Sequence, residues 1–464
     1  MRVKFNFSFT ERRLRLLYFR IFLLSRMRKL KLTMLTLLIM QVPKNSVAKI
    51  NPKVLEDFTT SGLTSPDGSK AVFDFYNRWD KADYLFGRGL YWDALEVRRK
   101  LMHDIYEYQG IEDKNHFPPL MSSSFTISIG HIGCIMLHQF GQELGILPSG
   151  KRHVLVGSRV GNSDALRLLR NKHSFIPSRG SDTNYFLPAS NVIENLQVFR
   201  SKGSFLDRYE LWEKIYSLNA FNFTNEFSEY KHEYTELCWQ KLSKLGVNRD
   251  SKIALFHLRN NGNSNETRNV SAEPFGRLAR HLGQNGYIVF QIGENESNSL
   301  SKYAKNVICL PEKKTDATLN LDLFLLYSCS IFIGTTSGPS IFPQIFRIPT
   351  LITNLTSISR NALSSDTSLY MPKFLYSTNG RKLEMDELLS SRFSFGGEYA
   401  HSQLKREGLI MRENDEKQIL EGAEELISRT KNGKIEPSII DHEIKQLQRN
   451  SRTVAFGLFA NSLF

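Results

Sequence analysis

The chain has 464 residues, of which 41% are hydrophobic and 23% charged. It is therefore long enough for about two or three domains and has the composition of an ordinary globular protein. Its formal net charge is +14, and residues 1–31 hold ten Lys or Arg against one acid, which places +9 in that segment and +5 in the rest. Because the remainder is only mildly basic and lacks zinc-finger spacing and an RNA-binding signature, we expect no nucleic-acid partner. The four cysteines form neither a C-x-x-C pair nor a disulfide framework, which predicts a reducing, cytoplasmic environment.

Residues 1–50 form a basic tail in which apolar runs alternate with Lys and Arg. The longest charge-free run, residues 32–42, is too short to cross a hydrocarbon core of about 30 Å, and no convincing signal-peptide cleavage site follows it. Residues 1–42 therefore predict an amphipathic segment that lies on an anionic membrane surface, here the inner face of the cell membrane. A mis-assigned start codon or a disordered basic tail is the alternative.

Residues 51–118 are predicted to form a linker and a helical pair, because apolar residues recur at helical spacing within residues 71–109. Strands and helices alternate through residues 119–245. The expected elements there are a strand at 125–129, a turn at 130–133, a helix at 134–144, a strand at 153–158, and helices at 163–170, 206–216 and 228–244.

A second alternating series occupies residues 246–410. Its expected elements are a strand at 253–258, a helix at 274–283, strands at 287–293 and 306–310, a helix at 321–327, a strand at 331–333, a helix opened by Pro339 and a strand after Pro349. Residues 355–404 are Ser- and Asn-rich and predict irregular structure. Residues 411–464 are expected to form C-terminal helices, including one at 418–429 that Asn414 or Asp415 caps.

Strands that alternate with helices imply parallel sheets joined by right-handed crossovers. We therefore predict an α/β fold of two Rossmann-like domains, residues 119–245 and residues 246–410, that face each other across a cleft.

Residues 334–338 read Gly-Thr-Thr-Ser-Gly and lie between an expected strand and an expected helix. Small residues at a helix N-terminus point backbone N–H groups at one spot, which is how α/β proteins hold phosphate. Thr335, Thr336, Ser337 and Gly338 are therefore candidate phosphate-binding residues. The alternative is a tight strand–helix turn that packs and binds nothing.

Two other strand ends in the second series carry polar residues that could reach the same ligand. His257 and Arg259 close the strand at residues 253–258, and Glu294 follows the strand at 287–293. Ligands of open α/β sheets bind outside the carboxyl ends of the strands, where an arginine offers a bidentate fork to a diphosphate. Glu294 could accept hydrogen bonds from a ribose or a base. Structural roles at a strand end remain the alternative for all three.

His131 is the candidate for acid–base chemistry in the first series. It is the only titratable side chain in the turn at residues 130–133 and could take a proton from an acceptor hydroxyl. A helix-capping or core histidine is the competing interpretation. The sequence has no D-x-D pair for a nucleotide-bound metal, no Walker A motif and no G-x-S-x-G elbow. We therefore expect neither a metal nor a cofactor, and an enzyme that neutralises a leaving diphosphate with arginine and helix N-termini.

Residues 253–354 resemble the C-terminal half of GT-B glycosyltransferases, in particular a bacterial family with an H-x-R strand end, a second strand ending in glycine and a D-x-F-L…C-x-F-F-I-G-T-x-S-G…P…N block. The matching residues are His257, Arg259, Tyr287 to Gly293, Asp322, Phe324, Leu325, Cys329, Phe332, Ile333, Gly334, Thr335, Ser337, Gly338, Pro349 and Asn354. More distantly, the chain is similar to heptosyltransferases. It departs from their pattern at His131 and Thr336, where they carry aspartates, and at Ile341, where they carry a histidine. The H-x-R element also resembles that of fucosyltransferases, whose arginine binds the donor β-phosphate.

The resemblance implies a metal-independent glycosyltransferase that moves a sugar from a nucleotide diphosphate donor to a hydroxyl of a glycan or glycolipid in cell-surface polysaccharide synthesis. Residues 246–410 would bind the donor through His257, Arg259, Glu294 and residues 335–338. Residues 119–245 would bind the acceptor beside His131. A nucleotide-sugar epimerase of the same architecture and a non-catalytic nucleotide-sugar or glycan-binding protein are the alternatives.

Overall fold

In the computed structural model of the chain, the described residues are 78, 81–82, 85, 93, 96–97, 100–101, 104, 120–121, 123–126, 128–147, 152–156, 160–169, 173–177, 198–201, 204–207, 211–212, 214–215, 218, 230–262, 266–293, 298–310, 321–356, 366–384, 387–388, 401–431, 434–438, 441–442 and 458–461. The predicted basic tail and Glu294 lie outside these residues. The described positions between 78 and 104 are helical. Within the described part of the chain, no helix combines the length and the apolar character needed to cross a bilayer.

The larger of two α/β units, called here the C-terminal unit, is built on a seven-stranded sheet in the order β16-β11-β10-β9-β6-β7-β8. All of its pairings are parallel. Its strands are β6 (Lys252–His257), β7 (Tyr287–Gln291), β8 (Val307–Cys309), β9 (Ile331–Thr335), β10 (Thr350–Leu355), β11 (Ser368–Pro372) and β16 (Leu458–Phe459). Counted along the chain, the first six strands have the spatial order 3-2-1-4-5-6, which is that of the Rossmann fold. The predicted fold class is confirmed.

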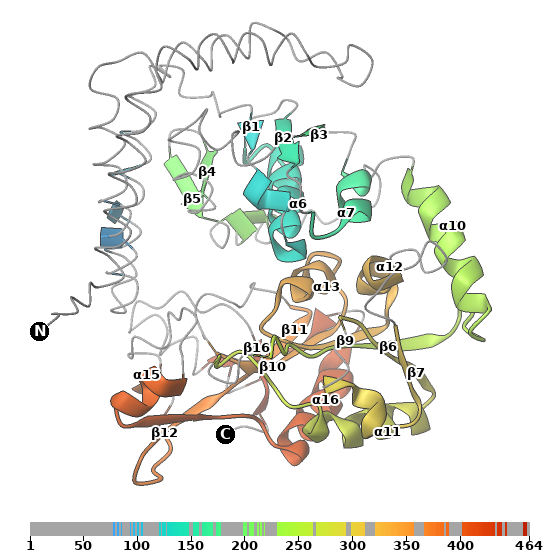
Figure 1. Cartoon of the computed structure of the whole chain (residues 1–464), viewed down its shortest axis with the longest axis vertical. Coiled ribbons are helices and arrows are strands. Elements are labelled where there is room, and N and C mark those ends of the chain that lie inside the picture. The colour runs from blue at the N-terminus through green and yellow to red at the C-terminus, as the bar shows by residue number, and fades with distance from the viewer. Residues whose placement is uncertain are drawn as a thin grey trace, which may run out of the picture.

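Helices cover both faces of this sheet (Figure 1). Helices α11 (Gly276–Gln284) and α16 (Glu416–Arg429) pack together on one face, and α12 (Leu321–Ser328) and α13 (Ile341–Ile345) pack together on the other. Because both faces are covered, β9, β10 and β11 are buried along their whole length. Helix α16 begins with the predicted cap, a capping box formed by Asp415 and Gln418.

The prediction of irregular structure for residues 355–404 was wrong, because β11 and β12 (Phe374–Ser377) lie there. Strand β11 pairs with β10 on one side and, on the other, with β16, which lies far along the chain. Polar residues on both sides of β11 hid its apolar pattern in the sequence. Strand β12 pairs antiparallel with β13 (Leu409–Arg412), which follows helix α15 (His401–Arg406).

The smaller α/β unit, called here the N-terminal unit, has a parallel three-stranded sheet of β1 (Leu120–Met121), β2 (Arg152–Val156) and β3 (His173–Pro177). It carries the 3-10 helix η1 (Ser123–Thr126) and the helices α6 (Ile129–Glu143) and α7 (Ser163–Leu168). Helix α6 is buried from Ile132 to Gly141, so it is the central element of this unit.

The predicted strand at residues 125–129 was wrong, and so was the predicted turn at residues 130–133. The alternation of apolar and hydroxyl residues suggested a strand, but Ser128 acts instead as the N-cap of α6. Its side chain accepts a hydrogen bond from the backbone N–H of His131, which satisfies one of the free donors of the first helical turn. The glycines at 130 and 133 therefore lie inside the helix.

Helix α10 (Tyr230–Ser243) connects the two units, and Figure 1 shows it running beside both of them. It contacts α7 of the N-terminal unit and α12 of the C-terminal unit. The helix predicted at residues 206–216 begins later than expected, because β4 (Val198–Ser201) and β5 (Ser204–Asp207) form a hairpin before it.

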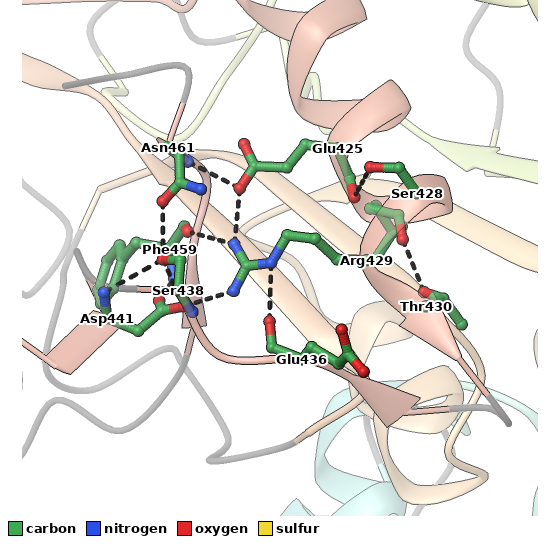
Figure 2. A network of polar contacts seen from close by, with 10 residues as sticks. Glu425, Ser428, Arg429, Thr430, Glu436, Ser438, Asp441, Phe459 and Asn461 are labelled. Atoms are coloured by element: carbon green, nitrogen blue, oxygen red, sulfur yellow. Dashed lines mark hydrogen bonds and ion pairs between the residues drawn. The ribbon is translucent and has the colours of Figure 1, made fainter.

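The end of the chain belongs to the C-terminal unit, where β16 adds an edge strand beside β11. Figure 2 shows how Arg429, the last residue of α16, holds this segment: its guanidinium contacts the carboxylates of Glu425 and Asp441 and the carbonyl oxygens of Glu436 and Phe459. The side chains of Arg429, Glu425 and Asp441 are 11%, 13% and 4% exposed. This buried network fixes the last strand and the short hairpin of β14 (Thr430–Lys431) and β15 (Lys434–Ile435) to the sheet.

Candidate functional site

The sheet order places a topological switch point between β6 and β9. From β6 the chain crosses through α11 to β7, and it enters β9 from α12 on the opposite face. The connections after β6 and β9 therefore leave towards opposite faces of the sheet. Open α/β sheets bind ligands in the crevice that forms at the carboxyl ends of two such strands. His257, the last residue of β6, is paired with Gly334 of β9. The H-x-R element and the turn at residues 334–338 thus meet at the switch point.

His257 and Ser337 are joined directly, with 2.9 Å between Nδ1 of the imidazole and Oγ of the serine. The ring also lies against Gly293, just after β7, where a Cβ atom would come within 2.8 Å of the ring. Gly293 has a φ of +64°, so both its backbone and its neighbour require glycine. Burial and the nearby charge of Arg259 lower the pKa of His257 to about 4. At neutral pH this histidine is therefore uncharged and acts as a hydrogen-bonding group.

Arg259 is held at both its backbone and its side chain. Its N–H donates to Oγ1 of Thr335 over 3.1 Å, and its carbonyl oxygen accepts from the N–H of Val270 over 3.0 Å. Its guanidinium donates from Nε and Nη2 to Oε1 of Glu266, at 3.0 and 2.8 Å. Nε of Arg268 donates to the same oxygen over 2.8 Å, so two guanidinium groups meet at one carboxylate.

Glu266 is the centre of this loop after β6. Its side chain is 10% exposed, and Nδ2 of Asn261 donates to its second oxygen. Burial by itself raises the pKa of Glu266, but the hydrogen bonds and charges of Arg259 and Arg268 outweigh burial and hold the pKa below its usual range. The carboxylate therefore stays ionised at neutral pH and keeps both arginines in place.

A buried lysine supports the same loop from the carboxyl end of another strand of the sheet, β11. Lys373, just after β11, has a side chain only 1% exposed. Its Nζ donates to the carbonyl oxygens of Thr267 and Asn269, over 2.8 and 2.9 Å, and lies 3.7 Å from Glu413. Burial lowers the pKa of Lys373, and Glu413 opposes that shift. Lys373 thus fixes the backbone carbonyl groups of the residues immediately before and after Arg268.

The four candidate residues of the turn differ in what they can offer. Thr335 is fully buried and its hydroxyl accepts from Arg259, while Thr336 is 6% exposed and its hydroxyl accepts from the N–H of Thr356 over 3.4 Å. Ser337 and Gly338 remain partly accessible. The two threonines therefore bind neighbouring backbone, and the second half of the turn faces the switch point.

The N-terminal end of helix α6, in the N-terminal unit, packs against this turn. Gly130, in its first turn, lies so close to Gly338 that a Cβ atom at residue 130 would come within 2.7 Å of the Gly338 Cα atom. A Cβ atom at Gly133 would likewise meet Ile341 at 2.5 Å. Glycine is required here for close approach of two backbones. The positive end of a helix of 15 residues therefore lies at the switch point of the other unit.

His131 lies in the first turn of α6, next to the Gly130–Gly338 contact, and is partly accessible. The structure thus brings His131, His257, Arg259 and residues 335–338 to one junction between the two units, while Glu294 lies outside the described residues. Sequence reasoning missed Glu266 and Arg268. The only available signal was the charged stretch Glu266-Thr267-Arg268 in the loop after a strand with a predicted ligand role.

Asn354, the last residue of the sequence block, has a structural role. It has a φ of +53° and is fully buried. Its backbone N–H donates to Oδ1 of Asn414 over 2.7 Å, and the N–H of Asn414 donates to Oδ1 of Asn354 over 2.8 Å. This reciprocal pair ties the end of β10 to the start of α16.

Comparison with known proteins gives distant structural similarity only. No family model matches the chain, and no curated protein matches it. Among solved structures, a glycosyl transferase family 9 protein from Veillonella parvula is 13% identical, with a TM-score of 0.41 over 67% of this chain and 97% of that one. The E. coli ADP-heptose LPS heptosyltransferase II is 12% identical, with a TM-score of 0.35 over 54% of this chain and 89% of that one. The E. coli heptosyltransferase WaaC with ADP is 13% identical, with a TM-score of 0.32 over 55% of this chain and 92% of that one. The fold assignment rests on the strand order.

Proposed function

We propose that the protein is a glycosyltransferase of GT-B type, which transfers a sugar from a nucleotide diphosphate donor to a hydroxyl group of a glycan or glycolipid. The C-terminal unit would bind the donor and the N-terminal unit the acceptor. The proposed setting is cell-surface polysaccharide or glycolipid synthesis. A basic tail at residues 1–42 would keep the enzyme near a membrane-bound acceptor, and that prediction concerns residues outside those described.

One observation carries the proposal: the switch point of the Rossmann-like sheet coincides with the junction between the two units. The connection after β6 brings Arg259, the connection after β9 brings Ser337 and Gly338, and α6 brings its N-terminus and His131. Guanidinium groups and backbone N–H groups are donors suited to a diphosphate. Groups from two units converge on one point in this arrangement, which suits a reaction in which each unit binds one of two substrates.

The chemistry follows from these groups. The acceptor oxygen bonds to the anomeric carbon while the bond from that carbon to the diphosphate oxygen breaks, and the nucleoside diphosphate leaves with the bonding electrons. Positive charge fixed in advance around the leaving group lowers the barrier to its departure. Arg259 would supply that charge with the α6 N-terminus, and the uncharged His257 with Ser337 would add hydrogen bonds. His131 would accept the proton of the acceptor hydroxyl. These roles do not require a metal.

The test measures binding of UDP, GDP, ADP, CDP and dTDP by titration calorimetry to the wild-type protein, Arg259→Ala and a control. Arg249→Ala is the matched control, because Arg249 also pairs with a carboxylate, Glu236, but is 58% exposed and precedes β6. We expect at least one nucleotide to bind, Arg259→Ala to weaken it at least about tenfold, and the control to match wild type. Absence of binding to every nucleotide, or equal affinity in Arg259→Ala, would refute the proposal.

Incubation with the matching nucleotide sugar separates the alternatives. A transferase consumes the donor faster when an acceptor is added and releases the nucleoside diphosphate. An epimerase converts the donor into an isomer without an acceptor, and a binding protein returns it unchanged.

A further inference from the structure

We propose that Arg268 is a second diphosphate-binding residue, which acts together with Arg259 at the switch point; this inference rests on the proposed function. The loop after β6 would then bind the donor with two guanidinium groups instead of one. Arg268 is not part of the H-x-R element, and its place beside Arg259 becomes visible only in the folded chain.

Arg268 lies close to Arg259. Nη2 of Arg259 and Nε of Arg268 each lie 2.8 Å from the same oxygen of Glu266, so these two nitrogens are no further apart than two hydrogen-bond lengths. The two phosphates of a diphosphate share one bridging oxygen, so two cations this close can contact both of them. A guanidinium group donates charge-assisted hydrogen bonds to phosphate, so the pair matches a ligand with two adjacent phosphates better than a ligand with one.

Both arginine side chains are partly accessible and are supported by a carboxylate. The side chains of Arg259 and Arg268 are 26% and 20% exposed, whereas Glu266 between them is 10% exposed. The carboxylate is therefore the least accessible of the three side chains, and each arginine side chain has surface that a ligand could contact. Glu266 binds Arg259 through Nε and Nη2, so a phosphate would meet that arginine at Nη1.

Hydrogen bonds within the protein fix the loop before any ligand arrives. Lys373 holds the carbonyl groups on both sides of Arg268. Asn261 and Asn269 exchange two hydrogen bonds across the loop, at 3.1 and 2.8 Å. A site whose backbone is already ordered loses less entropy when it binds. Burying the ammonium group of Lys373 costs free energy of desolvation. A loop that must be held ready for an anion explains why the protein carries that cost.

Arg268 could instead act only by neutralising Glu266, and a double substitution distinguishes the two roles. If Arg268 only neutralises Glu266, then in Arg268→Ala the carboxylate of Glu266 competes with the diphosphate for Arg259. The further change Glu266→Gln removes that competition. Affinity in Glu266→Gln/Arg268→Ala would then equal affinity in Glu266→Gln alone. If Arg268 binds the phosphate itself, the double variant stays weaker than Glu266→Gln.

The experiment measures affinity for inorganic pyrophosphate, inorganic phosphate and the nucleoside diphosphate that the wild type prefers, by calorimetry. Variants are Arg268→Ala, Glu266→Gln, the double variant and the control Arg249→Ala, each checked for folding by circular dichroism. We expect Arg268→Ala to bind pyrophosphate at least about tenfold more weakly than wild type does. We expect the double variant to bind it at least about tenfold more weakly than Glu266→Gln does. We also expect a reduced preference for pyrophosphate over phosphate in both.

Equal affinity of Glu266→Gln and the double variant, or an unchanged preference for pyrophosphate, would overturn the role of Arg268. Loss of binding in Arg259→Ala under the same conditions would still support the proposed function. If the wild type binds no nucleoside diphosphate at all, the proposed function fails first. The two failures are therefore distinguishable.

Discussion

Because folded His257 is uncharged at neutral pH, we can predict how the free energy of unfolding changes with pH. Its pKa is lowered to about 4, from an ordinary value of 6.5, by burial and by the charge of Arg259. The unfolded chain therefore takes up a proton at this residue as the pH falls through 6.5, while the folded chain does so only near pH 4. The contribution of uncharged His257 to the free energy of unfolding is therefore fully present above pH 6.5 and is lost as the pH falls towards 4.

The magnitude follows from the difference between the two pKa values. One pKa unit corresponds to about 1.4 kcal/mol, so the full effect is about 3 kcal/mol, or roughly 1 kcal/mol for each pH unit between 6.5 and 4. His257 as a whole is half-buried, which makes this value an upper bound. Below pH 4 the curve should flatten.

The assay compares wild type with His257→Gln by urea unfolding at several pH values between 4 and 7.5. Subtracting the two free energies of unfolding cancels groups that titrate in both proteins. We expect the difference to change by about 1 kcal/mol per pH unit in the stated window and to be constant above it. Parallel curves throughout, or a His257 ring that titrates near pH 6.5 by NMR, would refute the reasoning.

Two further substitutions test the junction and the chain end. Gly130→Ala would place a Cβ atom 2.7 Å from the Gly338 Cα atom, so we expect the units to shift apart by about 1 Å and donor turnover to fall by about a hundredfold. In the control Gly408→Ala the new atom meets open space, but the φ of +71° strains an alanine there. This control therefore costs stability without moving the units, and we expect its folded form to turn over the donor as wild type does. Equal turnover in both variants would contradict the prediction. Arg429→Ala leaves the carboxylates of Glu425 and Asp441 buried without their cation, so urea unfolding should show a loss of about 3 kcal/mol. The exposed Arg381, paired with Glu387, is the control and should change little when replaced by alanine. Equal stability of the two arginine variants would show that the network in Figure 2 does not hold the chain end.

Much of the C-terminal unit could be predicted because its strands are covered on both faces. Such strands read as continuous apolar runs, and the run that ends in His257 and the run that ends in Gly334 and Thr335 could be found without knowing their partners. Since the carboxyl ends of parallel strands lie at one edge, the meeting of His257 with the turn at residues 334–338 also followed from the sequence.

The remaining features depend on contacts between residues far apart in the chain. Strand β11 is a strand because β10 and β16 flank it, and its polar neighbours gave the opposite indication. Ser128 begins a helix where alternating residues suggested a strand. The burial of Thr335 beneath the backbone of Arg259, and the position of Arg268 between carbonyl groups bound by Lys373, arise from loop geometry. No local pattern encodes that geometry.

The most direct test of the account is an experimental structure of the protein with a bound nucleoside diphosphate. We expect the diphosphate at the switch point between β6 and β9, with one phosphate oxygen within hydrogen-bonding distance of the Arg259 guanidinium and another near Ser337 or Gly338. A nucleotide bound elsewhere, or a diphosphate in contact with neither Arg259 nor the turn, would contradict it.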